Sequence, residues 1–324
     1  KQNEFILKIK EAIPKKLENR LRNLVYDLRR YLIEDELQKM QAAKISQGLN
    51  GELISTKKIF TEFSKTEFNM KEFFLPFERL DLSYGWKSII NAKRAHYLDT
   101  AGDKTIVVSG KGDFIFFETK NFFSKKLDQK IIPSNLSDFI RNENFEFVGL
   151  RDLLIDEDNL YLSVILQDID KKYTLAIINA KLDYKKLKFQ FFFKTELLLT
   201  NYSIGSGGRI VNYGKNKLLF TIGHLDLKDK IQSKENLAGK IISIDKSDLS
   251  YEILSLGHRN QQGLFYFKNI KNNEFIINSE HGPKGGDEIN INNLNKQKLY
   301  NFGWPISSYG TNYDGTNPFK LNHK

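Results

Sequence analysis

Apolar side chains between residues 17 and 37 recur every three or four positions, with charged residues between them. This periodicity predicts an amphipathic helix after Pro14, and the glycines and asparagine of residues 47–51 supply a helix end. The helix either packs on a main domain or forms a short coiled-coil or juxtamembrane stalk. Residues 52–90 have a mixed composition with many aromatic side chains. We expect residues 73–77 to be an apolar linker that packs on a core.

From about residue 92 the pattern changes to short β-rich runs separated by Gly, Asn and Asp turns. Four similar runs occupy residues 104–109, 159–164, 217–222 and 274–279, so their starts are 55, 58 and 57 positions apart. A regular period with several strands per unit predicts the blades of a β-propeller. The alternative is a β-sandwich with coincidental spacing. The predicted fold is therefore an all-β propeller with about four blades over residues 92–324, preceded by a helical extension and linker over residues 1–91.

Composition limits the classes of protein that fit this pattern. The 324 residues are 40% hydrophobic and 13% aromatic, which is typical of a globular chain, and no apolar run approaches the ~18 residues of a membrane span. The absence of cysteine excludes disulfides, thiolate metal sites and cysteine nucleophiles. The net charge is +10, but its lysines are scattered among acidic residues, so we predict no nucleic-acid partner.

Polar, glycine-rich clusters concentrate between residues 203 and 306, and two of them directly follow a β-run. This placement predicts loops at blade ends around a central channel. Arg259, Asn260 and Gln262 offer hydrogen-bond donors to an anionic, planar ligand. The Gly282–Pro283 turn can direct backbone carbonyls at a hard cation, with carboxylates nearby. We expect the two loops to converge in one pocket.

Four motifs, at residues 257–264, 279–283, 286–290 and 301–305, resemble in their order and spacing the soluble glucose/sorbosone dehydrogenases. The resemblance covers roughly residues 92–310. It implies a six-bladed propeller that oxidises aldose sugars with pyrroloquinoline quinone (PQQ) and Ca²⁺ outside the cytoplasm, in the periplasm or an equivalent compartment. The implied partners are a sugar and an electron acceptor. Whether a signal peptide or membrane anchor lies upstream of residue 1 stays an open question.

The resemblance also implies roles for individual residues. Arg259, Asn260 and Gln262 match the quinone- and substrate-facing Arg-Asn-x-Gln of the family. The carbonyls of Gly282 and Pro283 match those that hold the catalytic calcium. Glu288 falls where the family has a ligand of a second, structural calcium.

The chain departs from the family at the catalytic base. The His expected four residues before Arg209 is Gly205, and the Asp that would orient it is His224. Because glycine cannot accept a proton, two hypotheses remain. Either the His224 side chain points into the space above Gly205 as a relocated base of a PQQ-dependent sugar dehydrogenase, or it is a polar turn residue of a non-catalytic propeller that binds a saccharide or a protein.

Overall fold

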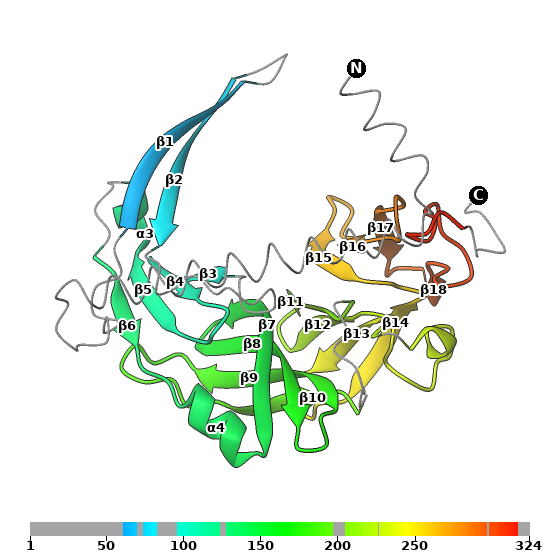
Figure 1. Ribbon diagram of the computed structural model, residues 1–324, viewed down its shortest axis with the longest axis horizontal. Helices are drawn as coiled ribbons and strands as arrows, with labels where there is room; N and C mark the ends of the chain where they lie inside the picture. The colour runs from blue at the N-terminus through cyan, green and yellow to red at the C-terminus, as the bar shows by residue number, and fades with distance from the viewer. Residues whose placement is uncertain are drawn as a thin grey trace, which may run out of the picture. The chain divides into compact units, whose positions relative to one another are not determined.

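The computed structural model describes residues 61–69, 74–82, 96–123, 128–196, 205–225, 227–296 and 298–316 (Figure 1). The chain divides into two compact units, Lys1–Lys58 and Ile59–Lys324, and all described residues belong to the second. The helix predicted within residues 17–37 lies outside the described residues. The predicted boundary between residues 91 and 92 stays a prediction.

The segment expected to be an apolar linker contains strands. β1 (Thr61–Asn69) and β2 (Phe74–Leu82) pair antiparallel over their whole length. Pro76 stands opposite Glu67 in this pairing. A two-stranded hairpin consists of edges only, and an edge strand tolerates a proline because one side of its backbone needs no partner.

Four antiparallel sheets follow in the described part of the chain, each taking its main strands in sequence order. Blade 1 contains β3 (Tyr97–Ala101), β4 (Lys104–Val108), β5 (Phe114–Glu118) and β6 (Lys130–Ile132). Blade 2 contains β7 (Phe145–Asp156), β8 (Asn159–Asp168), β9 (Tyr173–Lys181) and β10 (Gln190–Lys194). Blade 3 contains β11 (Gly207–Tyr213), β12 (Lys217–Ile222), β13 (Lys240–Asp245), β14 (Tyr251–Leu256) and, parallel to β14, β18 (Tyr300–Asn301). Blade 4 contains β15 (Gln261–Lys268), β16 (Glu274–Glu280) and β17 (Glu288–Asn293).

The blades have the arrangement of a β-propeller. The first strands contact one another in sequence, β3 with β7, β7 with β11 and β11 with β15, so they are the innermost strands. The four runs that the sequence singled out are β4, β8, β12 and β16, the second strand of each blade. The predicted equivalence of these runs is therefore confirmed.

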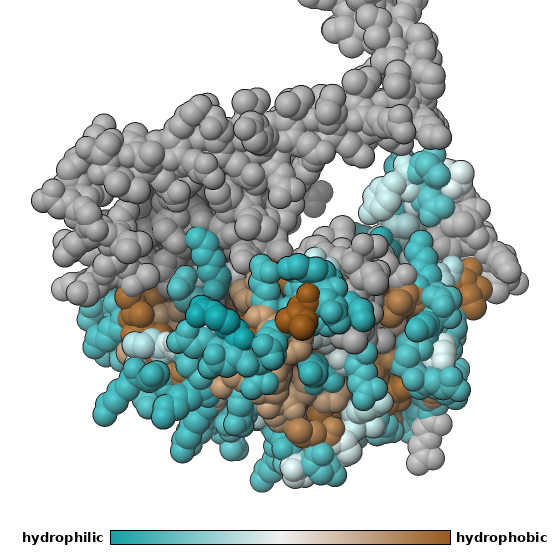
Figure 2. All heavy atoms as spheres, turned by 60° about the horizontal axis from the view of Figure 1, so that its bottom comes forward, coloured by the Kyte–Doolittle hydropathy of each residue, from teal (hydrophilic) through white to brown (hydrophobic). Residues whose placement is uncertain are grey.

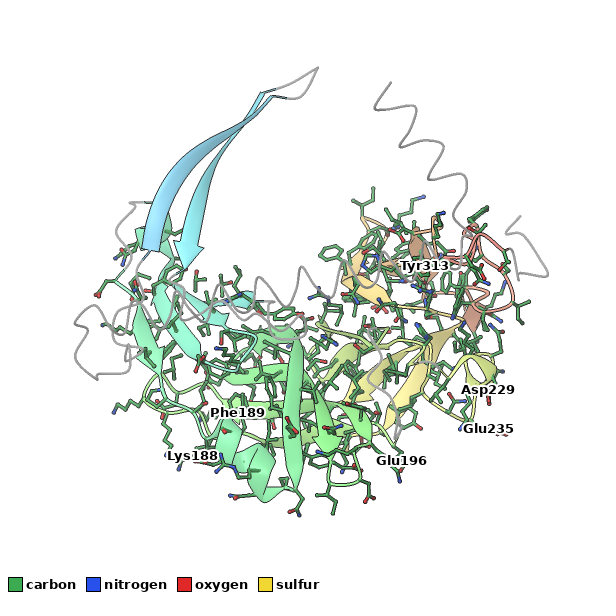
Figure 3. The ribbon with its side chains drawn as sticks, in the orientation of Figure 1. Lys188, Phe189, Glu196, Asp229, Glu235 and Tyr313 are labelled. Atoms are coloured by element: carbon green, nitrogen blue, oxygen red, sulfur yellow. The ribbon has the colours of Figure 1, made fainter. Side chains whose placement is uncertain are left out.

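Apolar side chains fill the space between successive blades. One buried cluster joins blades 1 and 2, a second joins blades 2 and 3, and a third joins blades 3 and 4. Phe189, labelled in Figure 3, stacks on Phe114 in the first of these clusters with ring centroids 5.6 Å apart. Such face-to-face packing is what the continuous apolar runs require, since both faces of β8 and β12 are buried.

Short helices occupy the connections. α3 (Thr119–Phe123) follows β5, α4 (Leu136–Asn142) buries Leu136 and Ile140 against the blades, and the 3-10 helix η3 (Lys228–Lys230) lies between β12 and β13. Among the described residues, no helix has the length and apolar character needed to cross a membrane. The face displayed in Figure 2 is largely hydrophilic, with apolar side chains between the polar ones.

Candidate functional site

Two loops of blade 4 meet at one end of its sheet. Gln261, at the start of β15, pairs with Glu280, at the end of β16, so the segments before and after these strands emerge together. The His281 N–H donates to the Asn260 carbonyl at 3.0 Å, and Arg259 Nη1 donates to the His281 carbonyl at 2.8 Å. The prediction that both loops lie at the same end of the strands is confirmed.

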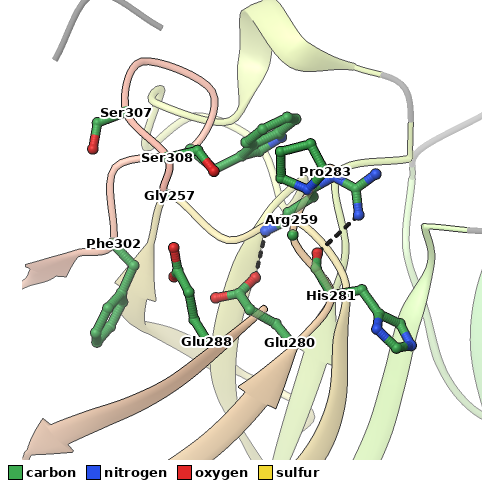
Figure 4. A pocket seen from close by; sticks show the side chains of 11 residues that line it. Gly257, Arg259, Glu280, His281, Pro283, Glu288, Phe302, Ser307 and Ser308 are labelled. Atoms are coloured by element: carbon green, nitrogen blue, oxygen red, sulfur yellow. Dashed lines mark hydrogen bonds between the residues drawn. The ribbon is translucent and has the colours of Figure 1, made fainter. Parts of the chain in front are cut away.

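A small pocket that is open to solvent lies where these loops meet residues 302–308 (Figure 4). Its lining consists of Gly257, Arg259, Glu280, His281, Gly282, Pro283, Glu288, Phe302, Trp304, Ser307 and Ser308. Four residues predicted from the sequence are among them: Arg259, Gly282, Pro283 and Glu288. Asn260 and Gln262 are not.

Asn260 and Gln262 instead join blade 4 to blade 3. Asn260 is buried, and its Oδ1 accepts from the Gly207 N–H at 3.2 Å and from Gln262 Nε2 at 2.7 Å. Gly207 begins β11, the innermost strand of blade 3. The amide side chains therefore hold two innermost strands together beside the pocket.

Positive charge gathers around Trp304, which is 7% exposed. The Arg259 guanidinium lies 5.3 Å from the centroid of the indole ring and the Lys228 ammonium lies 5.8 Å from it. Cations are attracted to the electron-rich face of an indole, so the ring holds both side chains near the pocket wall. Arg259 therefore supplies a positive charge to a pocket lining that also contains the Glu280 and Glu288 carboxylates.

The pocket also presents oxygen atoms to a cation. No N–H group of the described residues donates to the carbonyl oxygens of Gly282 and Pro283, while the Gly282 N–H donates to Asp287 Oδ1 at 2.9 Å. The Glu288 carboxylate lines the same pocket, and its Oε2 accepts from Asn290 Nδ2 at 3.3 Å. Within the described ranges, no three His, Asp or Glu side chains form a metal-ligating group. Carbonyl and carboxylate oxygens are the donors that a hard cation such as Ca²⁺ prefers, so Gly282 and Pro283 have the chemistry of the predicted catalytic calcium site and Glu288 that of the predicted second calcium site.

His224 occupies the space above Gly205. A Cβ atom built on Gly205 would lie 2.2 Å from His224 Nε2 and 2.6 Å from its Cδ2. The predicted direction of this side chain is therefore confirmed. The His224 backbone N–H donates to the Arg259 carbonyl at 2.7 Å, and its ring centroid lies 6.2 Å from that of Trp304. The imidazole is thus fixed beside the residues of the pocket.

Sequence reasoning missed two buried residues of the site, Glu280 and His258. The Glu280 carboxylate is 2.9 Å from His258 Nδ1, and His258 Nε2 is 2.8 Å from Ser255 Oγ. Burial works to raise the pKa of Glu280, but His258 and the backbone donors of Arg259 and Asn260 outweigh it and hold the pKa below its ordinary value. The only sequence signal was their position inside the motifs at 257–264 and 279–283.

Comparison with known proteins adds a family context. The family model described as glucose/sorbosone dehydrogenase matches residues 145–324. The aldose sugar dehydrogenase YliI of Escherichia coli K12 is 38% identical over 122 residues, which cover 34% of this chain and 31% of that protein. The quinoprotein glucose dehydrogenase B of Acinetobacter calcoaceticus is 30% identical over 128 residues, which cover 30% of this chain and 25% of that protein.

A solved structure is similar over a longer stretch. The soluble aldose sugar dehydrogenase (Asd) from Escherichia coli, in its apo form, superposes with a TM-score of 0.51 at 25% identity, covering 68% of this chain and 65% of that chain. The chain therefore matches less than a third of either curated relative and about two thirds of the solved structure.

Proposed function

The chain belongs to the glucose/sorbosone dehydrogenase family, and we propose that it oxidises aldose sugars with bound PQQ and Ca²⁺. The observation that carries the proposal is the pocket between the two loops of blade 4, which is lined by Arg259 and by the Gly282–Pro283 turn, with the His224 imidazole held beside it by the Arg259 carbonyl. Two relatives support it by their names, an aldose sugar dehydrogenase and a quinoprotein glucose dehydrogenase.

Different residues of the pocket would bind different parts of the cofactor. Arg259 would pair with an anionic group of the quinone, because a guanidinium binds carboxylates through two parallel hydrogen bonds. The Gly282 and Pro283 carbonyls would bind Ca²⁺, and Glu288 would supply a carboxylate to a calcium from the same wall. Asn260 and Gln262 would act by fixing β15 against β11. When bound, the quinone accepts hydride and Ca²⁺ polarises it as a Lewis acid.

His224 would take the proton of the anomeric hydroxyl. Imidazole is the side chain that exchanges protons near neutral pH, which suits a general base. Its ring stands in the volume that a side chain at position 205 would enter. The chain would therefore keep a base and attach it at the end of β12 instead of the segment before β11.

Membership of the family also supports a proposal about the protein's location and partners. We place the protein outside the cytoplasm, in the periplasm or an equivalent compartment, with an aldose as substrate and a separate acceptor for the electrons. The alternative function is a non-catalytic propeller that binds a saccharide or a protein partner. Gly205 favours this alternative, because the position of the family's base carries no side chain.

Reconstitution tests both functions. PQQ and Ca²⁺ are added to the purified chain, and the absorbance of bound quinone is followed as an aldose is added. We expect bound-quinone absorbance that the sugar bleaches. His224→Gln should slow bleaching by about 10²-fold or more, the usual contribution of a general base. The control is Asn216→Ala, at the opposite end of β12, where the side chain donates only to Asp245 and Ser247.

The outcomes separate the hypotheses. Bleaching that survives unchanged in His224→Gln would show that the base is not His224. If the wild-type chain binds no quinone, or binds it without bleaching, the proposed sugar oxidation is wrong. The alternative of a non-catalytic binding protein then remains, and titration calorimetry with the same aldoses tests it.

A further inference from the structure

The Glu280 carboxylate lies beneath the loop that carries Arg259 and Asn260. It ends β16 and is 6% exposed. Its Oε2 accepts from the Arg259 N–H at 2.6 Å (Figure 4). The same oxygen accepts from the Asn260 N–H at 3.3 Å. Two consecutive peptide groups of the pocket loop are therefore held by one oxygen atom.

The Arg259 peptide passes this restraint on to His224. The Arg259 N–H donates to Glu280, and the Arg259 carbonyl oxygen, which shares a peptide group with the Asn260 N–H, accepts from the His224 N–H at 2.7 Å. The guanidinium of Arg259 and the imidazole of His224 both flank the Trp304 ring. A shift of the Arg259 peptide would therefore move both side chains relative to the pocket.

The second carboxylate oxygen fixes Glu280 itself. Its Oε1 lies 2.9 Å from His258 Nδ1 and accepts from Asn290 Nδ2 at 2.6 Å. His258 is fully buried and is held in turn by Ser255 Oγ at 2.8 Å. The carboxylate cannot rotate away from the loop without breaking these contacts as well.

We propose that Glu280 is a positioning residue that sets Arg259 and His224 relative to each other, an inference that rests on the proposed function of the pocket. The Arg259 N–H, the Asn260 N–H and the Asn290 amide are all donors, and an ionised carboxylate accepts on both oxygens. Glutamine has the same shape but offers one N–H₂ group. In Glu280→Gln the N–H₂ group faces either the two loop N–H groups or the Asn290 amide. In both orientations a buried donor faces another donor, so the side chain holds the loop less firmly.

The test compares Glu280→Gln with Glu274→Gln. Glu274 begins the same strand and accepts from Tyr266 Oη at 3.0 Å and Lys268 Nζ at 2.8 Å, so it is a matched carboxylate far from the pocket end. Hydrogen exchange is measured at the Arg259 and Asn260 amides of the cofactor-free chain. We expect at least tenfold faster exchange in Glu280→Gln and no change in Glu274→Gln. Equal exchange in all three proteins would overturn the inference.

PQQ titration supplies the second measurement. In Glu280→Gln we expect the Kd for PQQ, measured with Ca²⁺ present, to rise at least tenfold, and sugar-driven bleaching to slow further, at a temperature well below the melting temperatures of both variants. Equal weakening in both variants would indicate general destabilisation and contradict positioning. If the wild-type chain binds no PQQ, the proposed function fails, while the exchange measurement still decides whether Glu280 holds the loop.

Ser255→Ala covers the case in which Glu280→Gln does not fold. This variant removes only the hydroxyl that restrains His258. Exchange at the Arg259 and Asn260 amides should rise several-fold, because His258 then holds the carboxylate less firmly. Unchanged exchange would argue against the network.

Discussion

At the scale of single residues, Gly205 is required by space and not by backbone conformation. Its φ angle lies outside the left-handed region, whereas the neighbouring Gly207 and Gly208 have φ values of +63° and +98°. What position 205 lacks is room, since the His224 ring fills the volume of a Cβ atom. The glycine and the histidine are therefore one structural unit.

Gly205→Ala tests this unit. The new methyl group must push the His224 imidazole aside, so we expect a loss of about 1–3 kcal/mol in the free energy of unfolding. Sugar-driven bleaching should slow, while the Kd for PQQ stays near that of the wild type. The control is a double-mutant cycle with His224→Ala, in which the methyl group has room and the loss should largely disappear. Additive losses would contradict the contact.

The pocket could be predicted from the sequence only in part. Arg259, Gly282 and Pro283 were found because guanidinium groups and Gly-Pro turns have recognisable chemistry in a loop. Glu280 was missed because its burial depends on the pairing of β15 with β16 and on donors from two segments, residues 258–260 and Asn290. In the sequence, it is one acidic residue next to a turn.

At the scale of elements, the second strand of each blade was predictable and the first was not. β12 is a continuous apolar run buried on both faces, whereas β11 begins with Gly207, Gly208 and Arg209 and reads as a loop. The innermost strands carry polar side chains because these side chains make hydrogen bonds to neighbouring strands. The hairpin of β1 and β2 was missed because a short apolar run such as residues 73–77 is as typical of a linker as of a strand.

Lys240 links a strand to the loop before it. It begins β13, is fully buried, and donates through Nζ to the carbonyls of Ile231 at 2.7 Å and Ala238 at 2.6 Å. These bonds fix the loop that contains η3 and Lys228. Burial lowers the pKa of the Lys240 ammonium to about 8.

This pKa predicts how stability changes with pH. Between about pH 8 and 10.5 the folded chain has released the Lys240 proton while the unfolded chain still binds it, so the free energy of unfolding rises with pH. From pH 7.5 to 9.5 the rise is about 2 kcal/mol. Urea unfolding of the wild type and of Lys240→Met at both pH values measures it. We expect the rise in the wild type only, and parallel pH dependence in the two proteins would show that the pKa of Lys240 is not lowered.

At the scale of the whole molecule, side chains of the innermost strands connect each blade to the next. Asp99 Oδ2 accepts from the Ile155 N–H at 2.7 Å, joining blade 1 to blade 2. Asp152 Oδ2 accepts from the Ile210 N–H at 2.9 Å, joining blade 2 to blade 3. Arg209 Nε donates to the Gln262 carbonyl at 2.6 Å, joining blade 3 to blade 4. The blades are thus joined by polar bonds near the centre as well as by the apolar clusters.

Asp152→Ala tests the importance of these central bonds. The carboxylate also pairs with Arg209 Nη1 at 3.1 Å, so its removal leaves the buried Ile210 N–H without its acceptor and the guanidinium without its carboxylate partner. We expect the free energy of unfolding to fall by about 3 kcal/mol. The control is Asp183→Ala, whose side chain accepts from the Lys185 N–H within its own exposed turn. Equal effects in urea unfolding would contradict a special role for the central bonds.

The contact between positions 205 and 224 also restricts how this site can change by single mutations. The family arrangement, His at 205 and Asp at 224, differs from the present one at both positions. If position 224 mutates first, two imidazoles compete for one volume, because even a methyl group at 205 meets the His224 ring. If position 205 mutates first, neither position carries an imidazole. If the base role proposed for His224 holds, both single-step intermediates between the arrangement that the resemblance implies and the present one are impaired, and strong epistasis between the two positions separates them by a fitness valley.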